Sequence, residues 1–153
     1  MPRPPLLLLM ILVSQGAPLA SQVTADRPLA FGIVVAGTAT NVSPASANAA
    51  QWRMHGTYLL GGTFSLTLPA TLLRQGGSET MPIAFCATCG IRQTNNSNPA
   101  TGTVFNPTTT QTVAALSLVV TIYVWLGASV TPPSNQVPGT YTGTVVLTTT
   151  GLL

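Results

Sequence analysis

The chain has 153 residues, of which 5% are charged and 46% are hydrophobic. It has five arginines and no lysine against two acids, Asp26 and Glu79, so the net charge of +3 reflects a shortage of acids and provides no basic stripe for tracking nucleic-acid phosphates. Two acids this far apart in sequence also supply no carboxylate pair for glycoside hydrolysis and no acidic cluster for calcium.

Residues 1–25 are predicted to be a secretory signal peptide. Arg3 precedes the apolar run 6–13, and small and polar residues follow it. The run is too short to span a bilayer, which takes about 20 apolar residues. Small residues stand at the offsets that a signal peptidase requires in 14–16 and again in 23–25, and we expect cleavage after the second set. Residues 26–153 would then form a single exported domain in the periplasm, at the cell surface or outside the cell, with no membrane-spanning segment.

Three segments in the first half of the mature chain alternate in the way of strands with one face on a core. In residues 29–36 the large apolar side chains take every second position. Residues 51–55 place Trp52 and Met54 on one face. Residues 63–68 alternate in the same way and end at a proline, which cannot extend a ladder.

The middle of the chain continues with turns and strands. Residues 75–78 predict a turn, and residues 79–86 a strand whose alternation is blurred by Pro82. Residues 92–107 are mostly polar and predict a long surface loop with room for one short strand. Residues 116–126 are nearly continuous apolar, β-branched and aromatic, which favours a central strand over a helix.

The closing stretch pairs a turn with a strand. Residues 131–139 are rich in Pro, Gly and Asn, and residues 140–148 are rich in Thr, Val and Tyr, which predicts the closing hairpin of a sandwich. No segment shows a capped helical stripe. The predicted fold is therefore all-β, an Ig-like or pilin-like antiparallel β-sandwich of about seven strands.

The two cysteines, Cys86 and Cys89, stand in a C-x-x-C spacing that fits a redox pair, half of a zinc site or a short disulfide. A thioredoxin-type pair needs a helix N-terminus in a βαβ setting, whereas this motif leaves a strand for a polar loop. Zinc needs about four ligands, and only His55, Asp26 and Glu79 could join the thiols. In an exported chain we expect a Cys86–Cys89 disulfide, worth at most about 2 kcal/mol because its loop is short.

The sequence offers no catalytic set. His55 is the single histidine, a Ser-His-Asp arrangement would have to use Asp26, and no Gly-x-Ser-x-Gly elbow is present. We expect His55 to be a solvated strand residue, and we expect no catalysis, cofactor or metal.

The scarcity of charge bears on the sheet edges. Soluble sandwiches usually protect their edges with Lys or other charges, and this chain has few. Either its edges pair with another strand, or Thr, Ser, Asn and Gln provide enough polar surface.

Five segments also form an ordered series of motifs: L-x-F-G-x-[IV]-x-x-G in 29–37, a strand ending in Gly in 52–56, an x-ITLP-like strand in 64–69, an L-x-V-G-[GA]-like strand in 123–128 and G-x-Y-x-G in 138–145. The series resembles the bacterial family called domain of unknown function 4402. The resemblance covers nearly the whole mature chain.

This resemblance implies an exported Ig-like β-sandwich, related in appearance to spore-coat-U-like proteins and chaperone-usher pilins, and it brings no established activity. The chain departs from pilins in two places. The C-x-x-C replaces their strand-to-strand disulfide, and residues 148–153 lack the expected final aromatic.

We therefore expect an exported structural or adhesive surface protein, a pilin-like subunit that assembles with itself or other surface subunits through β-strand edge pairing. With only a few residues ahead of Leu29, the mature chain is expected to accept a strand but not to donate one. The alternative is a self-sufficient secreted binding module that contacts a glycan or protein through the loop 93–103. An open groove beside the final strand would favour the first, and a closed sandwich the second.

Overall fold

The computed structural model describes residues 22–153, so the predicted apolar run and the first candidate cleavage site lie outside the described residues. The elements in chain order are β1 (Gln22–Arg27), β2 (Thr40–Val42), β3 (Ala50–Tyr58), β4 (Gly62–Thr67), β5 (Thr71–Arg74), β6 (Thr80–Ala84), β7 (Gly90–Thr94), the 3-10 helix η1 (Pro99–Thr101), β8 (Thr103–Phe105), β9 (Gln111–Val113), β10 (Leu116–Leu126), β11 (Ala128–Val130), β12 (Tyr141–Thr142) and β13 (Val146–Thr150). Within this range no helix has the length and apolar character needed to cross a bilayer.

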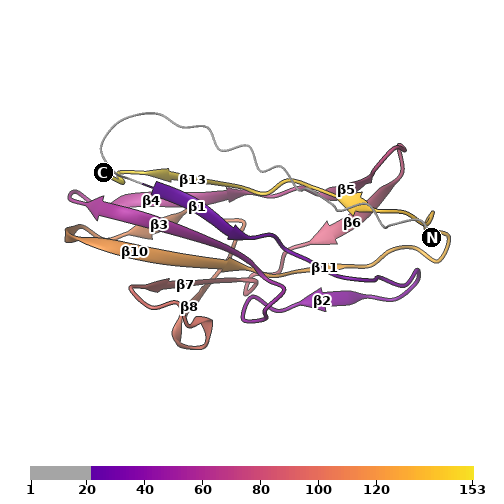
Figure 1. The fold of residues 1–153 in the computed structure, drawn as a ribbon, viewed down its shortest axis with the longest axis horizontal. Helices are drawn as coiled ribbons and strands as arrows, with labels where there is room; N and C mark the ends of the chain where they lie inside the picture. Colours follow the sequence, from indigo (N-terminus) through magenta and orange to yellow (C-terminus); the bar gives the residue numbers. More distant parts are fainter. Residues whose placement is uncertain (1–21) are drawn as a thin grey trace, which may run out of the picture.

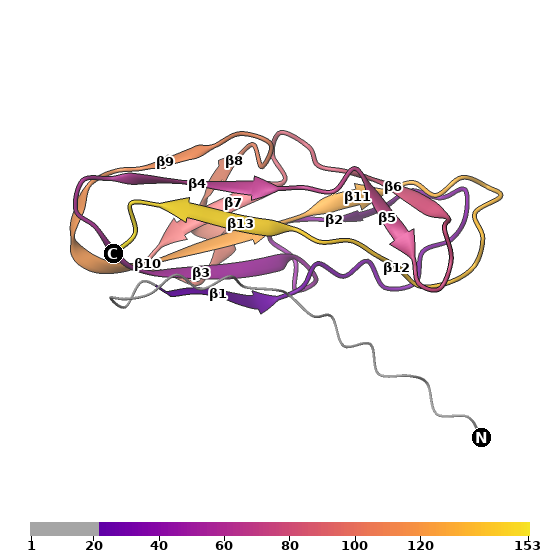
Figure 2. The ribbon, with the colours of Figure 1, turned by 90° about the horizontal axis from the view of Figure 1, so that it is seen from above.

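The strands form three antiparallel sheets, with the orders β1-β3-β10-β7-β8, β12-β5-β6-β11-β2 and β13-β4-β9. The molecule is elongated: the first and third sheets occupy one half, and the second sheet occupies the other half (Figures 1 and 2). The predicted all-β antiparallel sandwich is confirmed. The strands outnumber the expected seven partly because long strands are interrupted, as where β10 gives way to β11 and β12 to β13.

The pairing of β3 with β10 forms the centre of the larger half. Trp52 lies opposite Val124, and Met54 lies opposite Ile122, and all four side chains are buried. The intervening Arg53 faces outward, as the alternation in residues 51–55 predicts. The predicted central strand is confirmed, because β10 is hydrogen-bonded to β3 on one side and to β7 on the other.

The sheet β13-β4-β9 covers this inner face. Phe64 of β4 is 1% exposed and meets Phe105 of β8 edge-on, with the ring centroids 5.5 Å apart. Leu66 and Leu147 pack against the same core. The predicted strand 63–68 is thus confirmed, with its alternate apolar side chains turned inward.

The chain changes sheet at Gly127, between β10 and β11. A Cβ at this position would collide with the carbonyl oxygen of Val42 and with Pro44, so only glycine lets the two backbones approach this closely. The Gly127 N–H donates to the carbonyl of Cys89 at 2.8 Å, which fixes the crossover.

The expected strand at 29–36 is wrong, because the segment forms no strand. Gly32 has a left-handed φ of 68°, which interrupts the period of two, and Ile33 is 96% exposed instead of buried. A strand instead precedes this segment, in β1, where the signal peptide was expected to end.

The expected closing hairpin is also wrong. After the turn region, β12 pairs with β5 and β13 pairs with β4, whereas β11 pairs with β2 and β6. Prolines at 132, 133 and 138 lack the N–H groups that a ladder starting at the turn would need. The C-terminal strands β12 and β13 therefore pair with strands that are distant in sequence and not with the segment directly before the turn.

The region 92–107 is more regular than expected. The predicted short strand is β8, but β7 was missed because Arg92, Gln93 and Thr94 hide the apolar pattern. The predicted turn at 75–78 and the strand within 79–86, now β6, are confirmed.

We predict that Leu126→Ala destabilises the protein by about 2–5 kcal/mol, because Leu126 is fully buried between the sheets. Leu118→Ala is the matched control on the same strand, since Leu118 is 76% exposed, and it should change stability by less than about 0.5 kcal/mol. Urea unfolding of both variants tests this, and equal losses would contradict the assigned faces of β10.

The buried phenol of Tyr58 predicts a loss of stability at alkaline pH. Burial raises the pKa of Tyr58, against the opposing effect of its 3.0 Å hydrogen bond to Thr149. The folded state therefore keeps this proton above pH 10, where the unfolded chain releases it, so stability is full below about pH 10 and falls as the pH rises through the folded pKa.

Tyr58→Phe should remove this alkaline component and cost about 1 kcal/mol at neutral pH through the lost hydrogen bond. Urea unfolding at a series of pH values measures both effects. An alkaline loss of the same size in the variant would show that another group causes it.

Candidate functional site

The two acids are each paired with an arginine. Arg53 Nε donates to both carboxylate oxygens of Asp26, at 2.9 and 2.8 Å, and this hydrogen bond is the main reason that the pKa of Arg53 is raised. Glu79 accepts from Arg74 at 3.2 Å. The pKa of Glu79 is lowered, first by a hydrogen bond from its own backbone amide and then by Arg74.

His55 does not meet Asp26. It lies exposed on β3 with its Nδ1 2.9 Å from Thr121 Oγ1, as expected for a surface strand residue. Among residues 22–153 no three His, Cys, Asp or Glu side chains come close enough together to hold a metal ion.

Cys86 and Cys89 form a disulfide in the turn between β6 and β7, with their Cα atoms 5.0 Å apart. Cys89 is buried, and its Sγ accepts the backbone N–H of Cys86 at 3.1 Å, while Cys86 is exposed. The pair stiffens the turn from which β7 starts.

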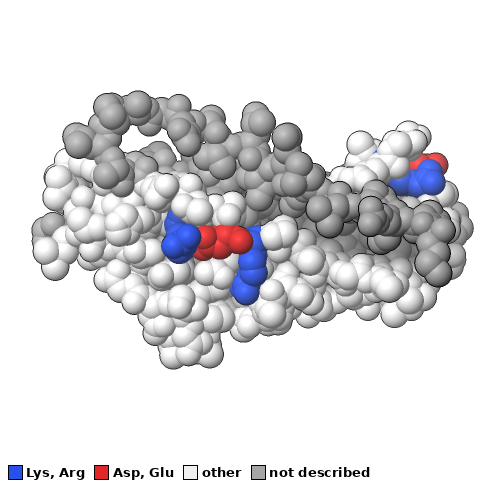
Figure 3. Space-filling model, viewed as in Figure 1, with Lys and Arg blue, Asp and Glu red and all other residues white. Residues whose placement is uncertain are grey.

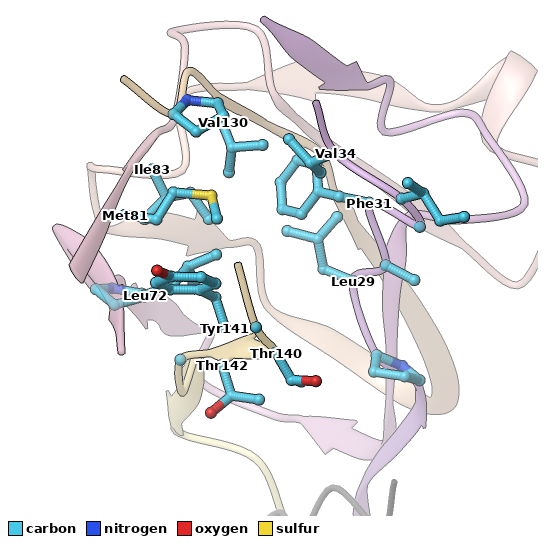
Figure 4. Close-up of a pocket in the computed structure, with 18 of the residues that line it drawn as sticks. Leu29, Phe31, Val34, Leu72, Met81, Ile83, Val130, Thr140, Tyr141 and Thr142 are labelled. Carbon is cyan, nitrogen blue, oxygen red and sulfur yellow. The ribbon is translucent and has the colours of Figure 1, made fainter. Parts of the chain in front are cut away.

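A cavity of about 740 Å³ lies in the half that contains the second sheet. We call it the apolar groove and define it by its two walls, residues 28–34 and 137–145, and by a floor from β3, β5, β6 and β11. In Figure 4, Leu29, Phe31 and Val34 face Val130, Ile83, Met81, Leu72 and Tyr141 across the opening. The lining is therefore largely aliphatic and aromatic.

Parts of both walls carry backbone groups that bond to no other residue of the described range 22–153. Within the described residues, segment 28–36 makes two backbone–backbone hydrogen bonds. Ala30 N donates to Asn48 O at 3.0 Å, and Val35 O accepts from Thr38 N at 3.1 Å. On the opposite wall Tyr141 and Thr142 pair with β5, and the carbonyls of Thr140 and Pro138 accept from Gln75 N at 2.8 Å and Arg74 Nε at 3.0 Å. Residues 143–145 form no strand. Extended chain with free N–H and C=O groups is the surface to which another strand pairs.

Two polar side-chain atoms in this region are buried without a hydrogen-bond partner, Arg27 Nε and Gln136 Oε1. Both residues line the apolar groove. Gln136 is held in place because its Nε2 donates to Tyr141 OH at 2.6 Å, and Tyr141 OH in turn donates to Val137 O at 2.6 Å. A free donor and a free acceptor match the C=O and N–H of a peptide group.

Little charge surrounds the groove. On the face seen in Figure 3, the charged side chains of the described residues gather in two small groups. The arginine and acid pairs Arg53–Asp26 and Arg74–Glu79 neutralise each other. The lining thus favours a largely apolar occupant, with Arg27, which belongs to neither pair, as the charged residue of the lining.

The sequence identified parts of this site without assembling them. Residues 29–36 were expected to lie in a sheet, yet they form a wall, and 138–145 were expected to lie in a closing hairpin, yet they form the opposite wall. The sequence did not identify Leu72 and Met81 as groove residues, because single apolar residues on short strands cannot be told from ordinary core residues.

Compared with known proteins, the chain matches no protein-family model, no curated protein and no solved structure. The resemblance to the family of domain of unknown function 4402 therefore stays a prediction from the order of the motifs.

We predict that replacing both cysteines, Cys86→Ser with Cys89→Ser, lowers the free energy of unfolding by at most about 2 kcal/mol, because the disulfide closes a very short loop. The fold should survive, and reducing the wild type should have the same effect. Urea unfolding with and without reductant measures this. Complete loss of cooperative unfolding would show that the turn is needed to form β7.

Proposed function

We propose that the protein is an exported structural or adhesive surface subunit, pilin-like in that it joins its neighbours by pairing β-strands, and that the apolar groove is where a partner's strand is accepted. The observation that carries this proposal is the groove itself, a cavity with an apolar floor whose wall 28–34 belongs to no sheet and makes few backbone hydrogen bonds within the described residues. No catalytic role is proposed.

Strand addition uses two kinds of contact, and the groove offers both. Backbone hydrogen bonds along the walls would give affinity, and apolar side chains at alternate positions of the incoming strand would enter the floor between Leu72, Met81 and Ile83. Charged side chains at a sheet edge usually prevent pairing with another chain, and few charged residues are available to do so here.

Although the sequence predicts that the mature chain accepts a strand without donating one, the described segment 29–36 has features of a donor strand. Its apolar residues alternate like those of a strand, but in its own chain it belongs to no sheet. Leu29 and Phe31 reach its own groove, whereas Ile33 and Val35 are 96% and 62% exposed. Exposed apolar side chains at alternate positions favour a segment that pairs after the monomer has folded.

The second candidate function is a self-sufficient binding module for a glycan or protein. It is favoured by the order in the polar loop between β7 and β8, where Gln93 Nε2 donates to the Thr101 carbonyl at 2.8 Å and Asn98 caps η1. A rigid loop with exposed amide and hydroxyl groups suits recognition of a polar ligand.

The test is size exclusion with light scattering on the exported protein, combined with titration of a peptide that copies residues 29–36 with terminal charges for solubility. We expect either polymers or a monomer that binds the peptide. Leu72→Arg should weaken peptide binding at least about tenfold, or 1.4 kcal/mol, because it places an unpaired charge in the groove.

Leu73→Arg is the matched control, because Leu73 is the next residue on β5 and is 52% exposed. It should bind the peptide like the wild type. Circular dichroism and thermal unfolding of both variants confirm that they are folded. A stable monomer that ignores the peptide would contradict strand acceptance and favour the binding module.

A further inference from the structure

The strand β1 includes residues that the sequence assigns to the signal peptide. It pairs antiparallel with β3 from Gln22, opposite His55, to Ala25, opposite Trp52. Val23 and Ala25 turn toward the main core and pack against it. Two of the three residues of the candidate cleavage motif 23–25 thus face the core.

The two ends of the described chain together cover the open edge of β3. β1 covers the part from Gln51 to His55, and the backbone of Leu153 pairs with Thr57 through N–O distances of 2.8 and 2.9 Å. The other edge of β3 is hydrogen-bonded to β10. β3 therefore behaves as an interior strand, and its Trp52 and Met54 are 6% and 0% exposed.

Asp26 fixes the end of β1. The register shifts between Ala25 and Arg27, so Asp26 is the extra residue of a bulge, and its carboxylate receives both hydrogen bonds from Arg53 Nε. A chain that began at Asp26 would place a new α-ammonium charge beside the Arg53 guanidinium. It would also lose four of the six residues of β1.

We infer that export processing leaves β1 on the mature domain, so that the signal peptidase cuts on the N-terminal side of Gln22 and not after Ala25. The candidate boundary after Gly16 meets this requirement, because it follows the apolar run directly and has small residues at the required offsets in 14–16. A cut after Ala25 would instead leave the edge of β3 exposed above Trp52 and Met54. This inference rests on the export that is part of the proposed function.

The direct test is the intact mass and N-terminal sequence of the protein exported from the full-length chain. A start between Ala17 and Gln22 is expected. Because the peptidase needs a small residue before the cut, Gly16→Leu should block or move the cleavage, and Ala25→Leu should leave it unchanged. A mature protein that starts at Asp26, or a chain that is exported uncut, would overturn the inference.

A second measurement separates the role of β1 from export. Chains 22–153 and 26–153 are refolded and their thermal unfolding is compared. The shorter chain should have a midpoint lower by at least about 5 °C, and a peptide copying residues 22–27 should raise it. Equal midpoints would overturn the role of β1 while leaving strand acceptance at the groove untouched, because the groove test depends on Leu72 and not on β1.

Discussion

The pairing of β3 with β10 is the contact on which the rest of the structure depends. Trp52 and Met54 on one strand and Val124 and Ile122 on the other place one continuous apolar face toward the sheet β13-β4-β9. Removing that face from water supplies the main favourable term for folding. Every other strand of this half either extends the pair sideways, as β1 and β7 do, or covers it, as β4 does.

The division of the molecule into two unlike halves follows from how long strands are interrupted. Gly127 lets the chain leave the first sheet after β10, Pro69 separates β4 from β5, and residues 143–145 separate β12 from β13. In one half the result is sheet packed on sheet. In the other half, the sheet β12-β5-β6-β11-β2 faces the segment 28–36, which belongs to no sheet, and the apolar groove lies between them.

The sequence predicted the elements whose pattern is local. Alternation identified β3 and β4, because a strand with one buried face has an apolar residue at every second position. The long apolar, β-branched run identified β10, because a strand buried on both faces is apolar along its whole length. Residues 29–36 show the limit of this reasoning. Their alternation is as regular as that of β4. Whether a segment joins a sheet, however, depends on the strands available to pair with it, and the left-handed φ of Gly32 breaks the extended backbone that pairing requires. The groove was not predictable, since it arises from segments more than 100 residues apart.

The edge of β3 and the apolar groove differ in how they are covered, and the difference bears on the proposed function. The edge of β3 borders the main core, where exposure would cost stability, and β1 and Leu153 cover it. The groove borders the smaller cluster of Met81, Ile83, Ala128 and Val130, and its wall 28–34 makes few backbone hydrogen bonds within the described residues. A protein can leave such an edge open only where the loss is local, because binding sites are drawn from the less stable parts of a fold. The stable half is thus the scaffold on which the groove is presented, and this arrangement supports our proposal that the groove accepts a partner's strand and not a small polar ligand.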